Sequence, residues 1–229
     1  MSVTSGRSPR PVVLRDIKGS PKVRSLIDGA NDMMKAMGYT EHGHRHVEVV
    51  AGITRYILEK LESPDRYVEL SMIAAHLHDI GNVINRIDHP LTGANLAYQL
   101  LNELGMPVPE ISLILGAIGN HEELAGAPIS LMGAAVIIAD KSDVHRTRVQ
   151  NPILETFDIH DRVNYAVTKS RVDMDTTTKT IALKLDIDQT FATVMEYFEI
   201  FLSRMVMCRK AAQFFGYRFT LEANGTHLE

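Results

Sequence analysis

The adjacent residues His78 and Asp79, with His46 upstream and Asp140 downstream, constrain the fold more than any other feature of this chain. Neutral imidazoles and carboxylates are the ligands that divalent transition metals accept. Adjacent residues rarely serve one ion unless the end of a helix directs both of them inward. We therefore expect three separated stretches of the chain to bring these four side chains to one metal-binding pocket.

The composition is that of an ordinary soluble protein. The chain has 229 residues, 45% of them hydrophobic and 23% charged. It can therefore bury a substantial core, and we expect it to fold without stabilising cross-links. The single cysteine, Cys208, cannot form an intrachain disulfide, and the N-terminal residues lack the apolar core of a signal peptide. No apolar run is long enough to span a membrane. We expect a cytoplasmic protein.

The charge pattern indicates a small ligand as partner. The net charge is −4 and there is no long basic run, so the electrostatics do not favour nucleic acid or an anionic membrane. The chain also lacks the basic stripe and stacking aromatics typical of nucleic-acid binding.

Apolar residues recur at helical spacing through the first 150 residues, where proline and glycine divide them into segments. The predicted helices are roughly residues 21–38, 40–61, 64–81, 90–105, 109–121 and 128–140. His78 and Asp79 fall in the last turn of the third. Residues 1–19, which contain Gly6 and Pro9, are expected to form a loose N-terminal lead-in.

The pattern changes after residue 150. Residues 163–173 and 180–187 are rich in Val, Ile, Thr and Tyr and flank a polar turn, which predicts a β-hairpin. Residues 189–215 return to helical spacing, and residues 217–221 could add a short strand. The predicted fold class is therefore mainly α, with a helical bundle over residues 20–150 and a small α+β appendage over residues 151–229.

The histidines are unevenly distributed. Seven of the ten fall between His42 and His121, which favours a site between packed helices. His42 and His44 are expected to be an exposed lead-in, and His76 to lie on a different helical face from His78. These three are left out of the predicted site.

Several motifs together resemble the HD superfamily of metal-dependent phosphohydrolases. The matching pieces are His46 with Val49-Val50-Ala51, then Ala75-His76-Leu77-His78-Asp79-Ile80-Gly81-Asn82, then Ile138-Ala139-Asp140-Lys141-Ser142-Asp143. The resemblance covers roughly residues 40–150. It implies an HD-type helical bundle in which His46, His78, Asp79 and Asp140 bind metal. The alternative is that these are helix-end polar residues satisfied by hydrogen bonds.

Two further histidines resemble those of the two-metal branch of this family. They are His89, which begins His89-Pro90-Leu91-Thr92-Gly93, and His121, which closes Ile118-Gly119-Asn120-His121. The resemblance implies a second ion about 3.5–4 Å from the first, with Asp79 bridging the two. The alternatives are helix capping or a hydrogen bond to substrate.

The chain departs from the HD-GYP branch, which cleaves cyclic dinucleotides. That branch has paired histidines where this chain has Asn120-His121, and its Gly-Tyr-Pro signature appears here as Gly126-Ala127-Pro128. The likeness to this branch is therefore partial, and it gives little support to a cyclic dinucleotide as substrate.

The implied activity is hydrolysis of a phosphomonoester or phosphodiester of a small, nucleotide-like substrate. A divalent ion lowers the pKa of bound water from 15.7 towards about 7. Asp79 would hold the ion, while Lys141 or Arg146 would stabilise charge on the phosphoryl oxygens or simply lie at a solvated helix end. Asp143 could polarise water, form hydrogen bonds to the metal ligands from behind, or pair with Arg146 at the surface.

The ligand types also bear on the ion. Mixed histidine and aspartate ligation suits manganese, iron, cobalt, nickel or zinc better than calcium, and magnesium fits if waters fill its shell. One or two ions are expected.

A non-enzymatic function remains open beside the enzymatic one. The chain could be a catalytically silent nucleotide-sensing or dimerisation module that retains the metal site. Its homodimer surface would use aromatic residues that could equally be core, namely Phe191, Phe198, Phe201, Phe214 and Phe215. Asp158, His160 and Asp161 are expected to serve turn and cap roles before the first strand rather than to form a ligand set.

Overall fold

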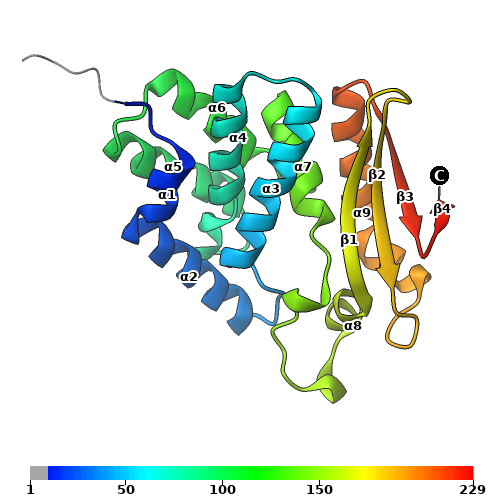
Figure 1. Ribbon diagram of the computed structural model, residues 1–229. Helices are drawn as coiled ribbons and strands as arrows, with labels where there is room; N and C mark the ends of the chain where they lie inside the picture. The colour runs from blue at the N-terminus through cyan, green and yellow to red at the C-terminus, as the bar shows by residue number, and fades with distance from the viewer. Residues whose placement is uncertain (1–9, 229) are drawn as a thin grey trace, which may run out of the picture.

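The computed structural model describes residues 10–228 and combines packed helices with one small sheet (Figure 1). The helices are α1 (Leu14–Gly19), α2 (Pro21–Ala36), α3 (His44–Lys60), α4 (Asp65–Leu77), α5 (His89–Glu103), α6 (Val108–Gly119), α7 (Leu131–Ser142), α8 (Ile159–Ala166) and α9 (Val194–Phe214). Short 3-10 turns are η1 (Ile80–Val83), η2 (Arg146–Arg148) and η3 (Leu154–Thr156). The strands are β1 (Val167–Asp175), β2 (Thr180–Ile187), β3 (Arg218–Ala223) and β4 (Thr226–Leu228).

The sheet lies at the C-terminal side of the molecule, with strand order β1-β2-β3-β4. Strands β1 and β2 form the expected antiparallel hairpin, in which Asp175 pairs with Thr180. Strand β3 lies parallel to β2, so the chain must cross over between them, and α9 makes that crossover. Helix α9 packs against both α7 and β3 and thereby joins the sheet to the helical part.

Helix α7 is apolar all round because both of its faces are buried. Val136 and Ala139 belong to a core cluster formed with α1 to α6. Ile137 and Ile138 belong to a second cluster formed with the sheet, α8 and α9. The helix therefore lies between two cores, and Asp140 near its C-terminal end is carried into the interior.

Three expectations about the elements need correction. Residues 14–19 are not loose, because they form α1 and bury Leu14 and Ile17; residues 1–9 lie outside the described part. The segment Val163–Ala166 is helical rather than strand, because the Asp158 side chain caps α8 by accepting a hydrogen bond from the Asp161 amide at 2.8 Å. Strand β4 was not predicted.

Most predicted helices are confirmed within a few residues at each end. The division into domains at residue 150 stays a prediction. The second core cluster contains residues from both sides of that boundary. Among residues 10–228, no helix is both long and apolar enough to cross a membrane.

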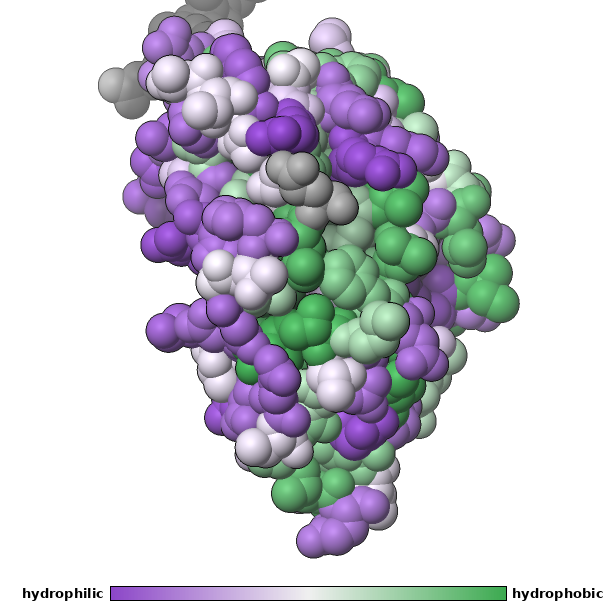
Figure 2. All heavy atoms as spheres, turned by 90° about the vertical axis from the view of Figure 1, so that its right-hand side faces the viewer, coloured by the Kyte–Doolittle hydropathy of each residue, from purple (hydrophilic) through white to green (hydrophobic). Residues whose placement is uncertain are grey.

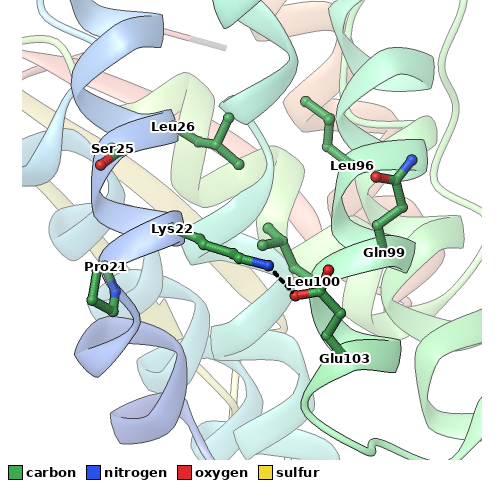
Figure 3. A pocket seen from close by; sticks show the side chains of 8 residues that line it. All are labelled: Pro21, Lys22, Ser25, Leu26, Leu96, Gln99, Leu100 and Glu103. Carbon is green, nitrogen blue, oxygen red and sulfur yellow. Dashed lines mark hydrogen bonds and ion pairs between the residues drawn. The ribbon is translucent and has the colours of Figure 1, made fainter.

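Two surface hollows lie away from the predicted site residues. One, of about 510 Å³, separates α2 from α5, and the ion pair between Lys22 and Glu103 crosses it (Figure 3). The other lies on the face that α9 and the last strands present, where apolar side chains gather (Figure 2). We call it the apolar groove, and its lining includes Phe198, Leu202, Met205, Val206, Phe219, Leu221 and Leu228.

Candidate metal centre

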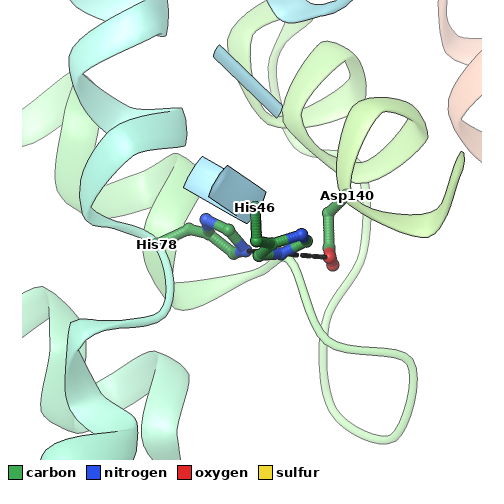
Figure 4. A group of neighbouring side chains, drawn as sticks. All are labelled: His46, His78 and Asp140. Carbon is green, nitrogen blue, oxygen red and sulfur yellow. Dashed lines mark hydrogen bonds and ion pairs between the residues drawn. The ribbon is translucent and has the colours of Figure 1, made fainter. Parts of the chain in front are cut away.

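The first half of the predicted site is formed by three helices. His46 lies in the first turn of α3, His78 follows the last residue of α4, and Asp140 lies in α7 (Figure 4). Atom Nε2 of His46 is 3.3 Å from Nε2 of His78 and 3.3 Å from Oδ1 of Asp140. These three side chains could hold one metal ion.

The second half is formed around His89 and His121. His89 is the first residue of α5, and His121 follows α6 by two residues. Their Nε2 atoms are 3.1 Å apart. Both histidines are buried, and each belongs to a group that could hold a metal ion, one of which adds Glu122.

Asp79 lies between the two halves. Its Oδ2 atom is 3.2 Å from Nε2 of His78 and 3.5 Å from Nε2 of His46. Its Oδ1 atom is 3.3 Å from Nε2 of His89 and 3.7 Å from Nε2 of His121. One carboxylate thus faces a different pair of imidazoles with each oxygen, as a bridging ligand would.

All four histidines are oriented through Nδ1. That atom lies 2.7 Å from the Ala75 carbonyl in His78, 2.9 Å from the Arg86 carbonyl in His89 and 2.6 Å from the Ile118 carbonyl in His121. In each case the acceptor is three residues earlier in the chain. Because a carbonyl can only accept, Nδ1 must carry the proton. Each Nε2 lone pair is then directed at the centre, as in metal-ligating histidines.

His46 is oriented by a carboxylate instead. Its Nδ1 atom is 2.8 Å from Oδ2 of Asp143, which is itself held by Arg45 at 2.9 Å. Asp143 is therefore buried behind His46 and positions that ring. The sequence placed Asp143 in the site, but the structure does not direct it at the central donor atoms.

The donor set fits a divalent cation. Imidazole lone pairs and carboxylate oxygens that face one another at 3.2–3.7 Å repel unless a proton or a cation lies between them. A tetrahedron of ligands about 2.0–2.1 Å from an ion has edges of about 3.3 Å, which matches these separations. The residues present can therefore hold metal.

The electrostatics of the buried centre also favour positive charge beside the carboxylates, as the pKa values of its side chains indicate. Burial acts to lower the pKa of His46, but hydrogen bonds to carboxylates, Asp140 first among them, raise it to about 9. Burial likewise opposes protonation of His78, but Asp79 raises its pKa to about 10. Burial also acts to raise the pKa of Asp79, yet His78 holds it well below its usual range.

Lys141 and Arg146, the two predicted phosphate-binding cations, lie in different places. Lys141 is buried, with Nζ 2.7 Å from Oδ2 of Asp140 and close to two glutamates, so it neutralises carboxylates at the centre. Arg146 is not brought to the cluster. Its guanidinium lies 5.0 Å from the Tyr165 ring and 4.0 Å from Asp188, because η2 directs it towards α8 and the end of β2.

The histidines left out of the predicted site have three different outcomes. His44 is exposed and pairs with Asp28, as expected. His76 is buried on another face of α4, near Glu48 of α3. His42 was expected to be exposed but is buried, because its ring packs 5.5 Å from that of His46.

Sequence reasoning missed several residues around the centre. Asn82 donates to Oδ1 of Asp79 at 3.0 Å and orients that carboxylate. Arg86 lies 3.2 Å from Nε2 of His89 and 3.1 Å from Glu122. Glu122 could have been suspected because it directly follows His121. Nothing in the local sequence marks Arg86, because only the tertiary fold brings it to the site.

The comparison with known families agrees with this geometry. Residues 43–145 match the family model of the HD domain. Over those residues the chain is similar to HD domains. The matched segment includes every predicted metal ligand, and the resemblance inferred from the motifs is confirmed. Likeness to the HD-GYP branch stays a prediction.

Individual relatives are more distant. An uncharacterised protein of Methanocaldococcus jannaschii is 25% identical, over 61% of this chain and 62% of the relative, so the chain spans less than two thirds of that protein. The crystal structure of a predicted HD superfamily hydrolase from an uncultured Thermotogales bacterium is 24% identical. It covers 58% of this chain and 75% of its own, with a TM-score of 0.43.

Proposed function

We propose that this HD-domain protein is a metal-dependent phosphohydrolase acting on a small phosphorylated substrate. The observation that carries the proposal is Asp79, whose two oxygens face two separate groups of imidazoles. Such an arrangement suits two ions that share a carboxylate, which is the geometry of many phosphate-cleaving centres. The HD domain over residues 43–145 supports the same activity.

Divalent cations held there would supply Lewis acidity and water that ionises near neutral pH. The chain's own residues prepare that chemistry. The four imidazoles are fixed with Nε2 towards the centre, and Asn82 fixes the Asp79 carboxylate. Lys141 offsets the charge of Asp140, so the buried carboxylates need not be balanced by metal alone.

The ligand chemistry limits the ions. Four imidazoles with two aspartates favour manganese, iron, cobalt, nickel or zinc over calcium. Magnesium would serve if it kept several waters. The proposed substrate is a phosphomonoester or phosphodiester of nucleotide-like size.

The test joins metal content to phosphate release. The purified protein should contain one to two equivalents of transition metal by plasma mass spectrometry. With manganese added, it should release phosphate from a member of a panel of mononucleotides, cyclic dinucleotides and guanosine tetraphosphate. Asp79→Ala should lose most of the metal and about 10²-fold or more of the rate, because both halves lose a ligand.

Asp65→Ala, at the exposed start of α4, is the matched control and should retain metal and rate. If the wild-type protein binds metal fully but cleaves no panel member, the second candidate function leads. That candidate is a nucleotide-sensing or dimerisation module, and the apolar groove on α9 is the observation that favours it. A protein that takes up no metal would contradict both.

A further inference from the structure

A cavity of about 300 Å³ adjoins the metal centre and is lined by parts of the chain far apart in sequence. Thr40 and His42 line it from the segment before α3, and Arg86 from the segment before α5. Asn164 of α8 and Arg204 of α9 line it from the C-terminal part. Two of its lining residues contact the centre, because His42 packs on His46 and Arg86 lies 3.2 Å from Nε2 of His89.

Two arginines in this lining are held by consecutive glutamates. Arg86 lies 3.1 Å from Glu122, and Nε of Arg204 lies 3.3 Å from Glu123. The guanidinium of Arg204 also lies 4.6 Å from the Phe201 ring, a contact that restricts it further. The two cations are therefore placed at one cavity by elements more than a hundred residues apart.

Both arginines keep access to the cavity. Their side chains are 20% and 28% exposed. A guanidinium has five N–H donors in a planar fork, and the carboxylate contact of Arg204 is at Nε. Its terminal nitrogens are suited to bidentate contact with phosphate oxygens, which is the recognition that arginine performs better than lysine.

We propose that Arg204, acting with Arg86, binds the phosphate of a singly phosphorylated small molecule of about mononucleotide size. The inference rests on the proposed function, whose substrate class it narrows. A volume of about 300 Å³ is at the lower end of the range for ligand cavities, about 300–1,000 Å³, so a two-nucleotide substrate would not be enclosed. Arg204 lies outside the HD segment, so the C-terminal part supplies substrate recognition.

The experiment measures orthophosphate binding to the metal-loaded full chain by titration calorimetry. Arg204→Ala should weaken binding at least about tenfold, because a charge-assisted hydrogen bond is lost. Arg204→Lys should weaken it less and leave the thermal midpoint unchanged, because it retains the ion pair with Glu123. Arg209→Ala, a change on an exposed face of the same helix, should bind like the wild type.

Metal content is measured on every variant, so loss of metal is separated from loss of anion binding. If Arg204→Ala and Arg204→Lys bind orthophosphate as the wild type does, with equal metal, the inference is overturned and Arg204 only fastens α9 to the loop after α6. It is also overturned if Arg209→Ala is equally weakened, or if the wild type binds no orthophosphate.

The kinetic arm separates this inference from the proposed function. On a hydrolysed substrate, Arg204→Lys should raise KM more than it lowers kcat, because the ground-state contact with phosphate is weakened. Orthophosphate binding that depends on Arg204, without hydrolysis of any panel member, would support the binding site and contradict the hydrolase. Hydrolysis with the same KM in Arg204→Lys as in the wild type would support the hydrolase and contradict the binding site.

Discussion

Asp143 shows how much of the centre depends on residues that do not face it. It accepts from Nδ1 of His46, so the lone pair of Nε2 is left for the centre. Arg45 and Arg148 hold the carboxylate in place. Burial acts to raise the pKa of Asp143, but His46 and these arginines hold it far below its usual range, so the acceptor stays ionised.

Asp143→Asn should weaken metal binding about 10–100-fold. The amide can donate to Nδ1, and the proton of His46 would then move to Nε2, where it blocks coordination. Competition titration with a chelating dye measures the affinity. Asp28→Asn is the matched control, since Asp28 pairs with the exposed His44, and it should have no effect. Equal affinities in the two variants would contradict this function of Asp143.

The thermal stabilisation by metal should grow between pH 7 and 8.5. In the metal-free protein, the raised pKa values of His46 and His78, about 9 and 10, mean that folding favours their protonated forms. That stabilisation is complete below about pH 6.5 and is lost as pH rises towards 9–10. Metal must displace those protons, so its affinity rises with pH.

Melting curves with and without zinc across this range measure the effect. The difference in Tm should widen as pH rises, and calorimetry in two buffers of different ionisation enthalpy should detect proton release on binding at pH 7. A constant difference and no proton release would show that the imidazoles are already neutral without metal.

The sequence could predict the six ligand candidates because the HD domain places them in short, ordered motifs. It could not predict the residues that surround them. Arg86 and Arg204 have ordinary local contexts, and their function comes from contacts that only the folded chain creates. His42 illustrates the limit, since its burial depends on packing against His46.

At the level of elements, the close approach of η1 to the start of α5 places His89 beside Asp79. A Cβ atom added at Gly81 would lie 2.0 Å from the His89 carbonyl oxygen and 2.5 Å from the Gly93 amide nitrogen. Neither backbone atom can yield without moving α5. Gly81, two residues after the His-Asp pair, is therefore required for the close approach that places His89 in the second half of the centre.

Gly81→Ala should destabilise the protein by about 1–3 kcal/mol or more and reduce metal content, because α5 and His89 must move away. Gly52→Ala is the matched control on the exposed face of α3, where an added Cβ meets nothing within 4 Å. It should stabilise by about 0.5–1 kcal/mol through helix propensity. Urea unfolding and metal analysis measure both. A Gly81→Ala protein with wild-type stability and metal would contradict the packing.

Helices were predictable where proline or a cap marks their start, as Pro21 does for α2. Composition misled at α8, where the Asp158 cap was expected to precede a strand. Val163 and its neighbours have strand-like side chains, but the Asp158 cap and burial against the sheet make them helical. The parallel pairing of β2 with β3 joins residues nearly forty positions apart, which no local pattern specifies.

At the scale of the molecule, the helical part and the C-terminal part share a core. One cluster contains Ile57 of α3 and Ile138 of α7 together with Leu183 of β2 and Phe201 of α9. Removing everything after residue 150 would expose that face of α7. The boundary predicted at residue 150 is therefore expected to mark a change of architecture rather than two independently folding units.

Calorimetric unfolding of the full chain should show one transition with equal calorimetric and van't Hoff enthalpies. A chain ending at residue 150 should lack a cooperative transition, because its largest apolar face has lost its cover. Two resolved transitions, or a cooperative melt of the shortened chain, would instead support separate domains.

Asp79 has one negative charge to share between two halves of the centre. The first cation bound would take up much of that charge, so the second would meet a less attractive half. Filling would then proceed in two steps as the cellular supply of metal rises. The rate of the hydrolysis that we propose would follow the weaker step, so that activity would respond to metal scarcity.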